Sequence, residues 1–323
     1  MSYDLHGVFV ISHDRRLRRY PRILQVSVAL LLLAAGASTV LAQNLEPRAY
    51  SNVPVGTHFL IASYSETRGG VSFDTALPVS GPELSVRSSI LGFATVMDLW
   101  GKTAKFDIVV PYASLSGSAR YQGSLVEREI NGFGDPVLRL SWNFHGSPAL
   151  TAREFSAYRQ DLIVGASVQV SVPTGQYDSS KIVNLGTNRW FIKPEVGASK
   201  ALGPWTLEAK GGVTFFTTNN NFYGGNSRAQ DPLYALQGNV IYSFGAGKWM
   251  SLDTTYFSGG RTTLNGALSN DLQKNWRTGI TLALPVDAQN SVKLFASRGV
   301  SSRTGNSFDQ FGIAWQHRWG GGV

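Results

Sequence analysis

The chain has 323 residues, of which 43% are hydrophobic and only 15% are charged, and it contains no cysteine. Charged residues make up about a quarter of an ordinary soluble protein, so this composition is unusual for one, yet the mean hydropathy of −0.06 is too low for a bundle of membrane helices. The absence of cysteine excludes disulfides, thiolate metal sites and a cysteine nucleophile.

The first segment of the chain is basic and then apolar. Residues 15–22 read RRLRRYPR, and an apolar core follows at 26–37. Small residues at Val40 and Ala42 complete the pattern of a secretory signal peptide that is cleaved after Ala42. A membrane anchor helix is the alternative, because the apolar run approaches the ~20 residues that span a bilayer. Polar residues within the run favour cleavage, so we predict a signal peptide over 1–42 and an exported protein.

Beyond this segment, no apolar run is long enough for a membrane helix, and the chain instead alternates between apolar and polar residues. The clearest example is LIVGASVQVSV at 162–172, whose odd and even positions differ in polarity as the two faces of a strand do. Most of these segments reach the about nine to eleven residues with which a tilted strand crosses a bilayer. We predict twelve strands, at 57–66, 84–99, 104–116, 134–145, 161–173, 189–200, 205–217, 232–245, 248–259, 274–285, 290–299 and 307–319.

The connections between these strands alternate between short and long. The short ones lie at 100–103, 201–204, 245–248 and 286–290. The long and polar ones lie at 67–83, 117–133, 174–188, 218–231, 260–273 and 300–306. Short turns at one end and long loops at the other are typical of a transmembrane barrel with both termini in the periplasm. The connection at 146–160 is an exception, because its position in the order calls for a short turn.

The eight tryptophans lie near the predicted strand ends. Amphipathic rings at both membrane interfaces form the aromatic girdles of such barrels, whereas ordinary core tryptophans would not favour strand ends. We predict an interfacial girdle of Trp100, Trp142, Trp190, Trp205, Trp249, Trp276, Trp315 and Trp319.

Four charges interrupt the apolar stretch at 191–216. A hairpin centred on Leu202 and Gly203 places Glu195 opposite Lys210 and puts Lys193, Glu195, Glu208 and Lys210 on one face. A Lys or Arg on the lipid face near the bilayer midplane costs about 2–4 kcal/mol, so we expect this charged face to line the interior of the barrel.

The same inward parity collects further charged residues along the chain. A soluble barrel would be expected to have the reverse polarity, with an apolar interior and a polar outside. The interior charges are either a structural ion-pair network or a constriction that selects a solute, and the sequence leaves both open. In addition to the four in the hairpin, the set contains Lys105, Asp107, Arg139, Asp253, Arg277, Lys293 and Arg318.

The chain beyond residue 42 offers little for catalysis or nucleic-acid binding. Its histidines are His58, His145 and His317, and none has a second histidine at ligand spacing, so we expect no metal site and no cofactor. His145 and Ser147 are the nearest candidate for a hydrolase pair, but they are too close in sequence for a catalytic triad, so we expect no enzyme. Lys and Arg residues are spread singly, which argues against a nucleic-acid surface.

Several turn and strand motifs resemble a known family. They are NLEPRAYSNVPVGTHFL at 44–60, GFGDP at 132–136, SVPTGQYD at 171–178 and NLGTNRWFIKPEVGASKALGPWTLE at 184–208. They resemble the outer-membrane transporters of the MetA-pathway phenol-degradation family, and the resemblance extends over 44–319. It implies an outer-membrane barrel associated with the uptake of aromatic compounds, and it supplies no binding residues.

We therefore predict an all-β protein, an antiparallel up-and-down barrel of about twelve strands over 57–323. Residues 43–56 would form a periplasmic segment that partly plugs the mouth. The predicted function is passive uptake of small hydrophobic or aromatic solutes across the bacterial outer membrane. The alternative is a closed barrel that binds lipopolysaccharide or another surface through loops such as 218–231. Expected partners are outer-membrane lipid and lipopolysaccharide, the solute, and the insertion machinery, which would read Trp319.

Overall fold

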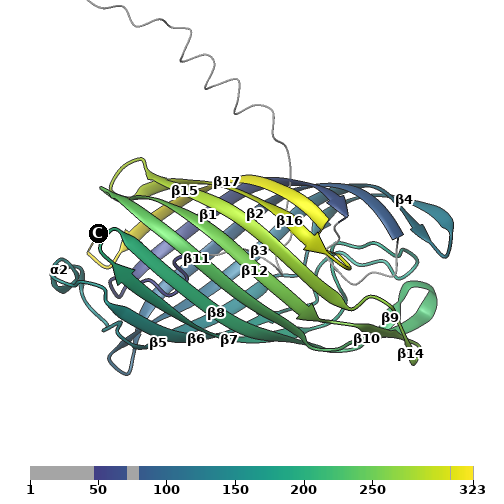
Figure 1. The fold of residues 1–323 in the computed structure, drawn as a ribbon, viewed down its shortest axis with the longest axis horizontal. Coiled ribbons are helices and arrows are strands. Elements are labelled where there is room, and N and C mark those ends of the chain that lie inside the picture. Colours follow the sequence, from purple (N-terminus) through teal and green to yellow (C-terminus); the bar gives the residue numbers. More distant parts are fainter. Residues whose placement is uncertain (1–46, 71–79, 306, 323) are drawn as a thin grey trace, which may run out of the picture. The chain divides into compact units, whose positions relative to one another are not determined.

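The computed structural model describes residues 47–70, 80–305 and 307–322. The predicted signal peptide at 1–42 lies outside these residues. The described chain is almost entirely β-structure (Figure 1). Strands that follow one another along the chain mostly lie side by side as antiparallel pairs.

Within the described residues, twelve strands close into a barrel, which confirms the predicted fold class. Each strand pairs with its neighbour in the chain order, and the last strand pairs with the first from Thr57↔Gly320 to Gly70↔Ser307. Closure leaves no unpaired edge around the ring, as the hydrocarbon core of a bilayer requires. The ring consists of β1 (Thr57–Gly70), β2 (Ser80–Leu99), β3 (Lys102–Tyr121), β5 (Val137–His145), β6 (Leu162–Ser171), β7 (Phe191–Leu202), β8 (Trp205–Phe216), β11 (Leu233–Gly245), β12 (Lys248–Gly259), β15 (Gln273–Pro285), β16 (Asn290–Ser302) and β17 (Ser307–Gly320).

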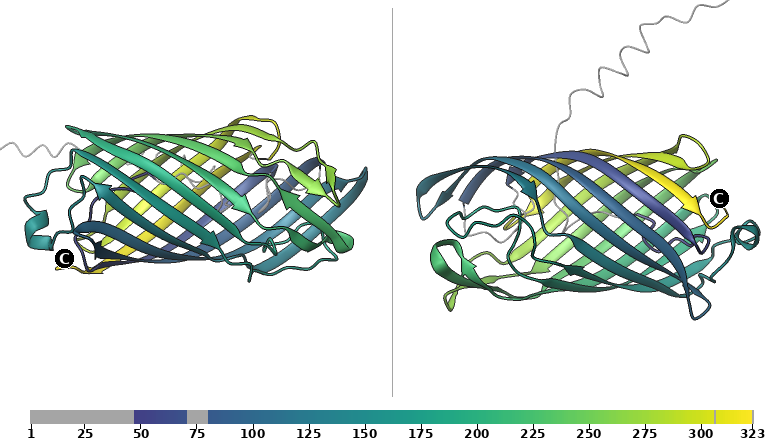
Figure 2. Two further views of the ribbon diagram at one scale, coloured as in Figure 1. Left: turned by 90° about the horizontal axis from the view of Figure 1, so that it is seen from below. Right: turned by 180° about the vertical axis from the view of Figure 1, so that it is seen from behind.

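The two ends of the barrel differ in their connections (Figure 2). The end that holds the C-terminus, here the turn end, has two-residue turns such as Gly203–Pro204 between β7 and β8 and Ala246–Gly247 between β11 and β12. The opposite end, here the loop end, carries the long connections. The exceptional connection 146–160 lies at the turn end and contains the short helix α2 (Ala152–Phe155).

Several predicted loops contain strands of their own. Residues 117–133, predicted as a loop, extend β3 to Tyr121 and return as β4 (Ser124–Phe133), so that β4 and β5 pair with successive parts of β3. Two other loop-end connections meet in a separate four-stranded sheet. Its strands are β9 (Asn219–Phe222), β10 (Asn226–Gln230), β13 (Thr262–Leu264) and β14 (Ala267–Leu268), with the 3₁₀ turn η2 (Tyr223–Gly225) between β9 and β10.

The polarity of the barrel wall is inverted relative to that of a soluble barrel. Outward-facing residues are apolar and exposed, including Leu91, Val168, Val196, Leu207, Leu236, Leu252 and Ile280. Inward-facing residues are polar and buried, including Glu195, Glu208, Lys210, Gln237, Asn239, Asp253 and Arg277. This arrangement is typical of a transmembrane barrel, whose outer wall faces lipid and whose interior is polar.

The β7–β8 hairpin has the predicted faces but not the predicted register. Its turn is Gly203–Pro204, so Leu202 pairs with Trp205 and Glu195 lies opposite Gly212 instead of Lys210. Gly203 has a φ of +61°, as the first central residue of a type II′ turn requires, and Pro204 fits the second. The shift is an even number of residues, so every side chain keeps its face.

The tryptophan prediction was wrong for Trp249. This side chain is only 7% exposed and faces the interior, because it shares the inward parity of Ser251 and Asp253 on β12. The other seven lie on the outer wall or in turns at both ends of the barrel. Trp100 contacts Trp142 and Trp205 contacts Tyr242 at the turn end, and Trp276 contacts Tyr256 nearer the loop end.

Candidate functional site

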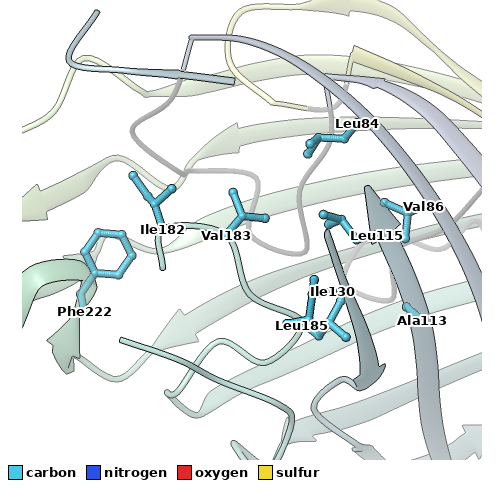
Figure 3. Packing of buried hydrophobic residues seen from close by; sticks show 9 residues of the cluster. All are labelled: Leu84, Val86, Ala113, Leu115, Ile130, Ile182, Val183, Leu185 and Phe222. Atoms are coloured by element: carbon cyan, nitrogen blue, oxygen red, sulfur yellow. The ribbon is translucent and has the colours of Figure 1, made fainter. Parts of the chain in front are cut away.

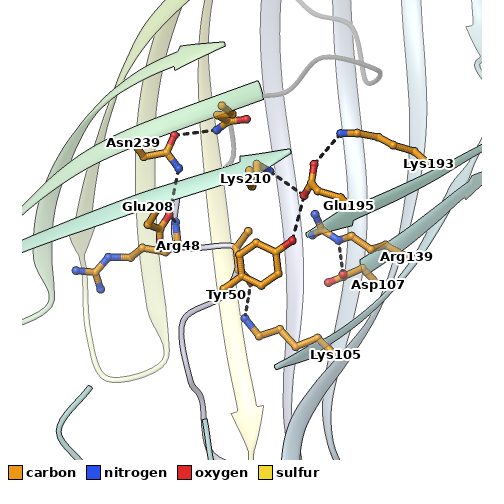
Figure 4. A network of polar contacts seen from close by, with 12 residues as sticks. Arg48, Tyr50, Lys105, Asp107, Arg139, Lys193, Glu195, Glu208, Lys210 and Asn239 are labelled. Carbon is orange, nitrogen blue, oxygen red and sulfur yellow. Dashed lines mark hydrogen bonds and ion pairs between the residues drawn. The ribbon is translucent and has the colours of Figure 1, made fainter. Parts of the chain in front are cut away.

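The inner wall formed by β3, β5, β7 and β8 carries a cluster of charged side chains, here called the ion network (Figure 4). Arg139 Nε lies 2.7 Å from Asp107 Oδ2. Lys193 Nζ lies 2.9 Å from Glu195 Oε2, and Lys210 Nζ lies 3.3 Å from Glu195 Oε1. Glu195 and Lys210 therefore pair despite the shifted register, because they are diagonal neighbours on the same face. The ion network consists of the wall residues Lys105, Asp107, Arg139, Lys193, Glu195, Glu208 and Lys210, together with Arg48 from the segment before β1.

The ion network is largely removed from water. Glu195, Glu208 and Lys210 are each less than 9% exposed. Such burial is costly for a charge unless it is paired and hydrogen-bonded. Glu208 meets this requirement through Ser199 Oγ at 2.9 Å and Asn239 Nδ2 at 3.1 Å, which both donate to its carboxylate.

The segment before β1 enters the barrel and contacts the ion network. The backbone N–H of Arg48 donates to Glu208 Oε2 at 2.7 Å, and the Arg48 guanidinium lies 5.1 Å from the centre of the Trp249 ring. Lys105 Nζ donates to the carbonyl of Ala49 at 3.1 Å. These contacts join a segment at the N-terminal side of the barrel to β3, β8 and β12 across its interior.

Tyr50 is a deeply buried side chain of this segment. It is 2% exposed, and its hydroxyl donates to Glu195 Oε1 at 3.4 Å. Its ring lies against Gly165 and Gly197, which pair across β6 and β7. A Cβ added to Gly165 or Gly197 would lie 2.6 or 2.4 Å from the Tyr50 ring, so only glycine leaves room for the ring there.

The long β5–β6 connection supports the same segment from the turn end. Asn52 Nδ2 donates to the Pro148 carbonyl at 3.1 Å, and the N–H of Val55 donates to the Leu150 carbonyl at 2.8 Å. Thr103 Oγ1 donates to Asn52 Oδ1. The helical turn α2 lies within the connection and begins with a capping box between Thr151 and Glu154. The exceptional length of 146–160 thus supplies a surface against which residues 52–55 bind.

Two of the remaining predicted interior residues border the ion network, because Asp253 interacts electrostatically with Glu208 and Lys210, and Lys293 lies over the same Trp249 ring as Arg48. Asp253 accepts from Ser251 Oγ at 3.1 Å. Arg277 is 1% exposed, donates to the Phe308 carbonyl and to Ser297 Oγ, and stacks on the Phe308 ring. Lys293 Nζ lies 6.0 Å from the centre of the Trp249 ring. Arg318 donates to the Ala288 carbonyl and so lies at the turn-end rim.

At the loop end, the interior is apolar. The β6–β7 connection folds back so that Ile182, Val183 and Leu185 pack against inward residues of the extended wall (Figure 3). Arg128 Nε of β4 donates to the Val183 carbonyl at 3.0 Å and helps to hold the connection in place. The wall side of this cluster consists of Leu84, Val86, Ala113, Leu115 and Ile130, and Phe222 completes it from β9.

Asp135 fixes the β6–β7 connection at the break between β4 and β5. Its carboxylate accepts from the N–H of Gly175 at 2.9 Å, and from the N–H and Oγ1 of Thr187 at 2.8 and 2.7 Å. Burial raises the pKa of Asp135, although these hydrogen bonds act to lower it. The three turn motifs at 132–136, 171–178 and 184–190 therefore converge on one carboxylate.

Neither a metal centre nor a helical membrane span is found among the described residues. No group of three or more potential His, Cys, Asp or Glu ligands lies together in the described part of the chain. None of the helices within the described ranges has the length and apolar character that crossing a bilayer demands.

The sequence matches one protein family over most of its length. The family description reads "Putative MetA-pathway of phenol degradation", and the match extends over residues 66–316. The chain belongs to this family. No curated protein matches the sequence.

Two solved structures that resemble this family member differ in how similar they are to it. The COG4313 outer membrane channel from Pseudomonas putida F1 superimposes with a TM-score of 0.73 at 21% identity, covering 85% of this chain and 100% of that chain. The β domain of the Bordetella autotransporter BrkA gives a TM-score of 0.48 at 10% identity, covering 82% of this chain and all of that one. The first likeness establishes the twelve-stranded fold, and the second is too distant to support an argument.

Proposed function

We propose that this family member is an outer-membrane channel for the passive uptake of small hydrophobic or aromatic solutes. The observation that carries the proposal is the inverted polarity of a closed barrel. An apolar outer wall with aromatic rings at both ends suits a lipid bilayer, and a buried charged inner wall suits a solute pathway. The proposal involves no catalysis.

Two comparisons support this function. The family is described in connection with phenol degradation, and the structure with the TM-score of 0.73 is of an outer membrane channel. The proposed partners are outer-membrane lipid and lipopolysaccharide at the outer wall, and the insertion machinery. That machinery would read Trp319, which lies on the outer face of the last strand and is 36% exposed.

Residues 47–56 give the channel a proposed plug. Their contacts with Glu208, Lys105 and Glu195 occupy the interior near the turn end. A pathway through the barrel would have to pass this segment or displace it. The same contacts support a second candidate function, a closed barrel that binds surfaces through its loops and conducts nothing.

Planar-bilayer recording of the purified protein separates the two candidates. We expect small stepwise currents in potassium chloride, because a polar pathway past the plug conducts ions. A folded, inserted protein that gives no current steps would contradict the channel and favour the closed barrel.

Removal of the plug provides a second arm of this experiment. We expect deletion of 43–56 to increase the unit conductance, because it clears the interior near Glu195 and Glu208. The full-length double variant Arg48→Ala/Tyr50→Ala is the matched control, and we expect it to give an intermediate conductance. Unchanged conductance in a deletion variant that still folds would contradict the plug.

A further inference from the structure

The inner wall of the barrel has an apolar side as well as a charged one. Inward positions on β1, β2, β3 and β16 hold large apolar residues that are partly exposed, unlike the buried charges of β7 and β8. We call this surface the apolar strip, and it consists of Phe59, Ile61, Ile90, Val109 and Phe295.

Two glycines lie beside residues of the apolar strip. Gly92 of β2 pairs with Ile61 of β1 on one side and with Val109 of β3 on the other. A Cβ added to Gly92 would lie 3.5 Å from the Ile61 Cβ. Gly312 of β17 lies under the Phe295 ring. A Cβ added to Gly312 would lie 2.3 Å from this ring, so the glycine leaves room for the ring to extend toward β1. The two glycines thus leave space beside the Ile61 side chain and the Phe295 ring.

The apolar strip borders the ion network on β3 and faces it across the barrel. Val109 is the next inward position after Asp107, the partner of Arg139. In the closed ring of twelve strands, β1 and β8 lie on opposite sides, since the same number of strands separates them in each direction. A solute in the interior would therefore meet an apolar wall and a charged wall at once.

The charges of the ion network indicate what kind of polar group the solute carries. The network contains five cationic side chains, Arg48, Lys105, Arg139, Lys193 and Lys210, against the three carboxylates of Asp107, Glu195 and Glu208. The bordering residues Lys293 and Asp253 add one charge of each sign and leave this excess unchanged. Arg139 and Lys193 also retain 20% and 16% of their side-chain exposure, whereas Lys210 retains 7%. An excess of cations favours an anionic group, and Arg139 and Lys193 keep part of their exposure although each is paired with a carboxylate.

We infer that the apolar strip and the ion network together form a binding site for aromatic carboxylates. The ring contacts Ile61, Ile90 and Val109, and the carboxylate faces Arg139 and Lys193. Covering apolar side chains that otherwise contact water stabilises the ring, and the two cations stabilise the anion. This inference rests on the proposed channel function and names the solute class that the channel holds.

Uptake into proteoliposomes in excess of uptake into protein-free vesicles tests this site with three probes, namely benzoate, benzyl alcohol and acetate. We expect saturable benzoate uptake, with a lower half-saturation concentration than for the other two. In Ile61→Thr/Ile90→Thr, we expect the benzoate value to rise about fivefold to tenfold, because the ring loses part of its apolar contact. Acetate flux should not change. Thr keeps the β-branched shape, so the strands should still form.

Two further variants separate charge from shape. Lys193→Gln should raise the half-saturation concentration for benzoate but not for benzyl alcohol. Thr255→Val, an inward change on the opposite wall, is the matched control and should leave benzoate uptake unchanged, since the Thr255 hydroxyl has no hydrogen-bond partner among the described residues.

The possible failures are distinguishable. Wild-type vesicles that admit none of the probes faster than protein-free vesicles do would overturn the channel function itself. Vesicles that admit all three probes without saturation, or a double Thr variant with unchanged benzoate uptake, would overturn the binding site while the channel function stands. Equal half-saturation for benzoate and benzyl alcohol would overturn the role of the cations.

Discussion

At the scale of single residues, Glu195 is the carboxylate on which the ion network depends. It pairs with Lys193 and Lys210 and accepts from the Tyr50 hydroxyl, while being only 7% exposed. Removing one member of a buried charge cluster leaves its partners buried without compensation, which is the costly case. The plug and the wall therefore share one carboxylate, so a change at Glu195 affects both.

We expect Glu195→Ala to lower the free energy of unfolding by about 3–5 kcal/mol, because Lys193 and Lys210 lose their buried counter-charge. Urea unfolding in phospholipid vesicles measures this. The matched control is Asp309→Asn, which removes the exposed pair with Arg298 at 3.2 Å. That change should cost less than ~1 kcal/mol, as exposed pairs do. An equal loss in the free energy of unfolding for the two variants would contradict the conclusion that burial makes the Glu195 pairs more important than the exposed pair.

At the scale of elements, the β6–β7 connection is a long loop with a fixed structure. Asp135 accepts three hydrogen bonds from it, and its side chains Ile182, Val183 and Leu185 are buried. A connection held at both a polar and an apolar contact opens less readily than one exposed to water along its length. The convergence of three turn motifs on Asp135 explains why these turns carry recognisable sequences.

We expect Asp135→Asn to release this connection. An amide presents one oxygen where the carboxylate presents two, and its NH₂ group would face the donors of Thr187 or Gly175, so at least one hydrogen bond is lost. Limited proteolysis of the inserted protein should then cleave within 172–190 faster than in the wild type. Ser180→Ala, a change in the same connection but away from Asp135, provides the control and should leave cleavage unchanged. Identical cleavage in all three proteins would contradict the role of Asp135.

At the scale of the whole molecule, the two faces of the wall experience different surroundings. Val168 and Gln169 are neighbours on β6, but Val168 faces outward with 41% exposure and Gln169 faces inward toward Lys193 of β7. A lipid-facing lysine near the midplane costs about 2–4 kcal/mol, whereas one in the interior changes only the local charge balance.

We expect Val168→Lys to lower the free energy of unfolding in vesicles by about 2–4 kcal/mol and Gln169→Lys to lower it by much less. Folding titrations of both variants in the same lipid measure the difference. A larger loss for Gln169→Lys would reverse the assignment of the two faces and contradict a membrane-facing outer wall.

The sequence predicted the strands and their faces because alternation depends only on neighbouring residues. Residues 124–133 were predicted as loop, because SLVEREINGF carries polar groups at positions on both faces. Trp249 was assigned by its place near a strand end, although the parity of Ser251 and Asp253 already pointed inward. The contacts of Arg48 and Tyr50 could not be predicted, since they join residues more than a hundred positions apart.

The glycines under Tyr50 have a consequence for the living cell. Gly165 and Gly197 form the only kind of surface on which that ring fits, so a larger residue at either position would push the ring away from the wall. Such a substitution needs one nucleotide change, and at Gly197 the added Cβ would also lie 2.8 Å from the Lys210 Cβ on the next strand. In the channel that we propose, moving the ring would widen the pathway past the plug, so a bacterium carrying the substitution would admit larger molecules through its envelope.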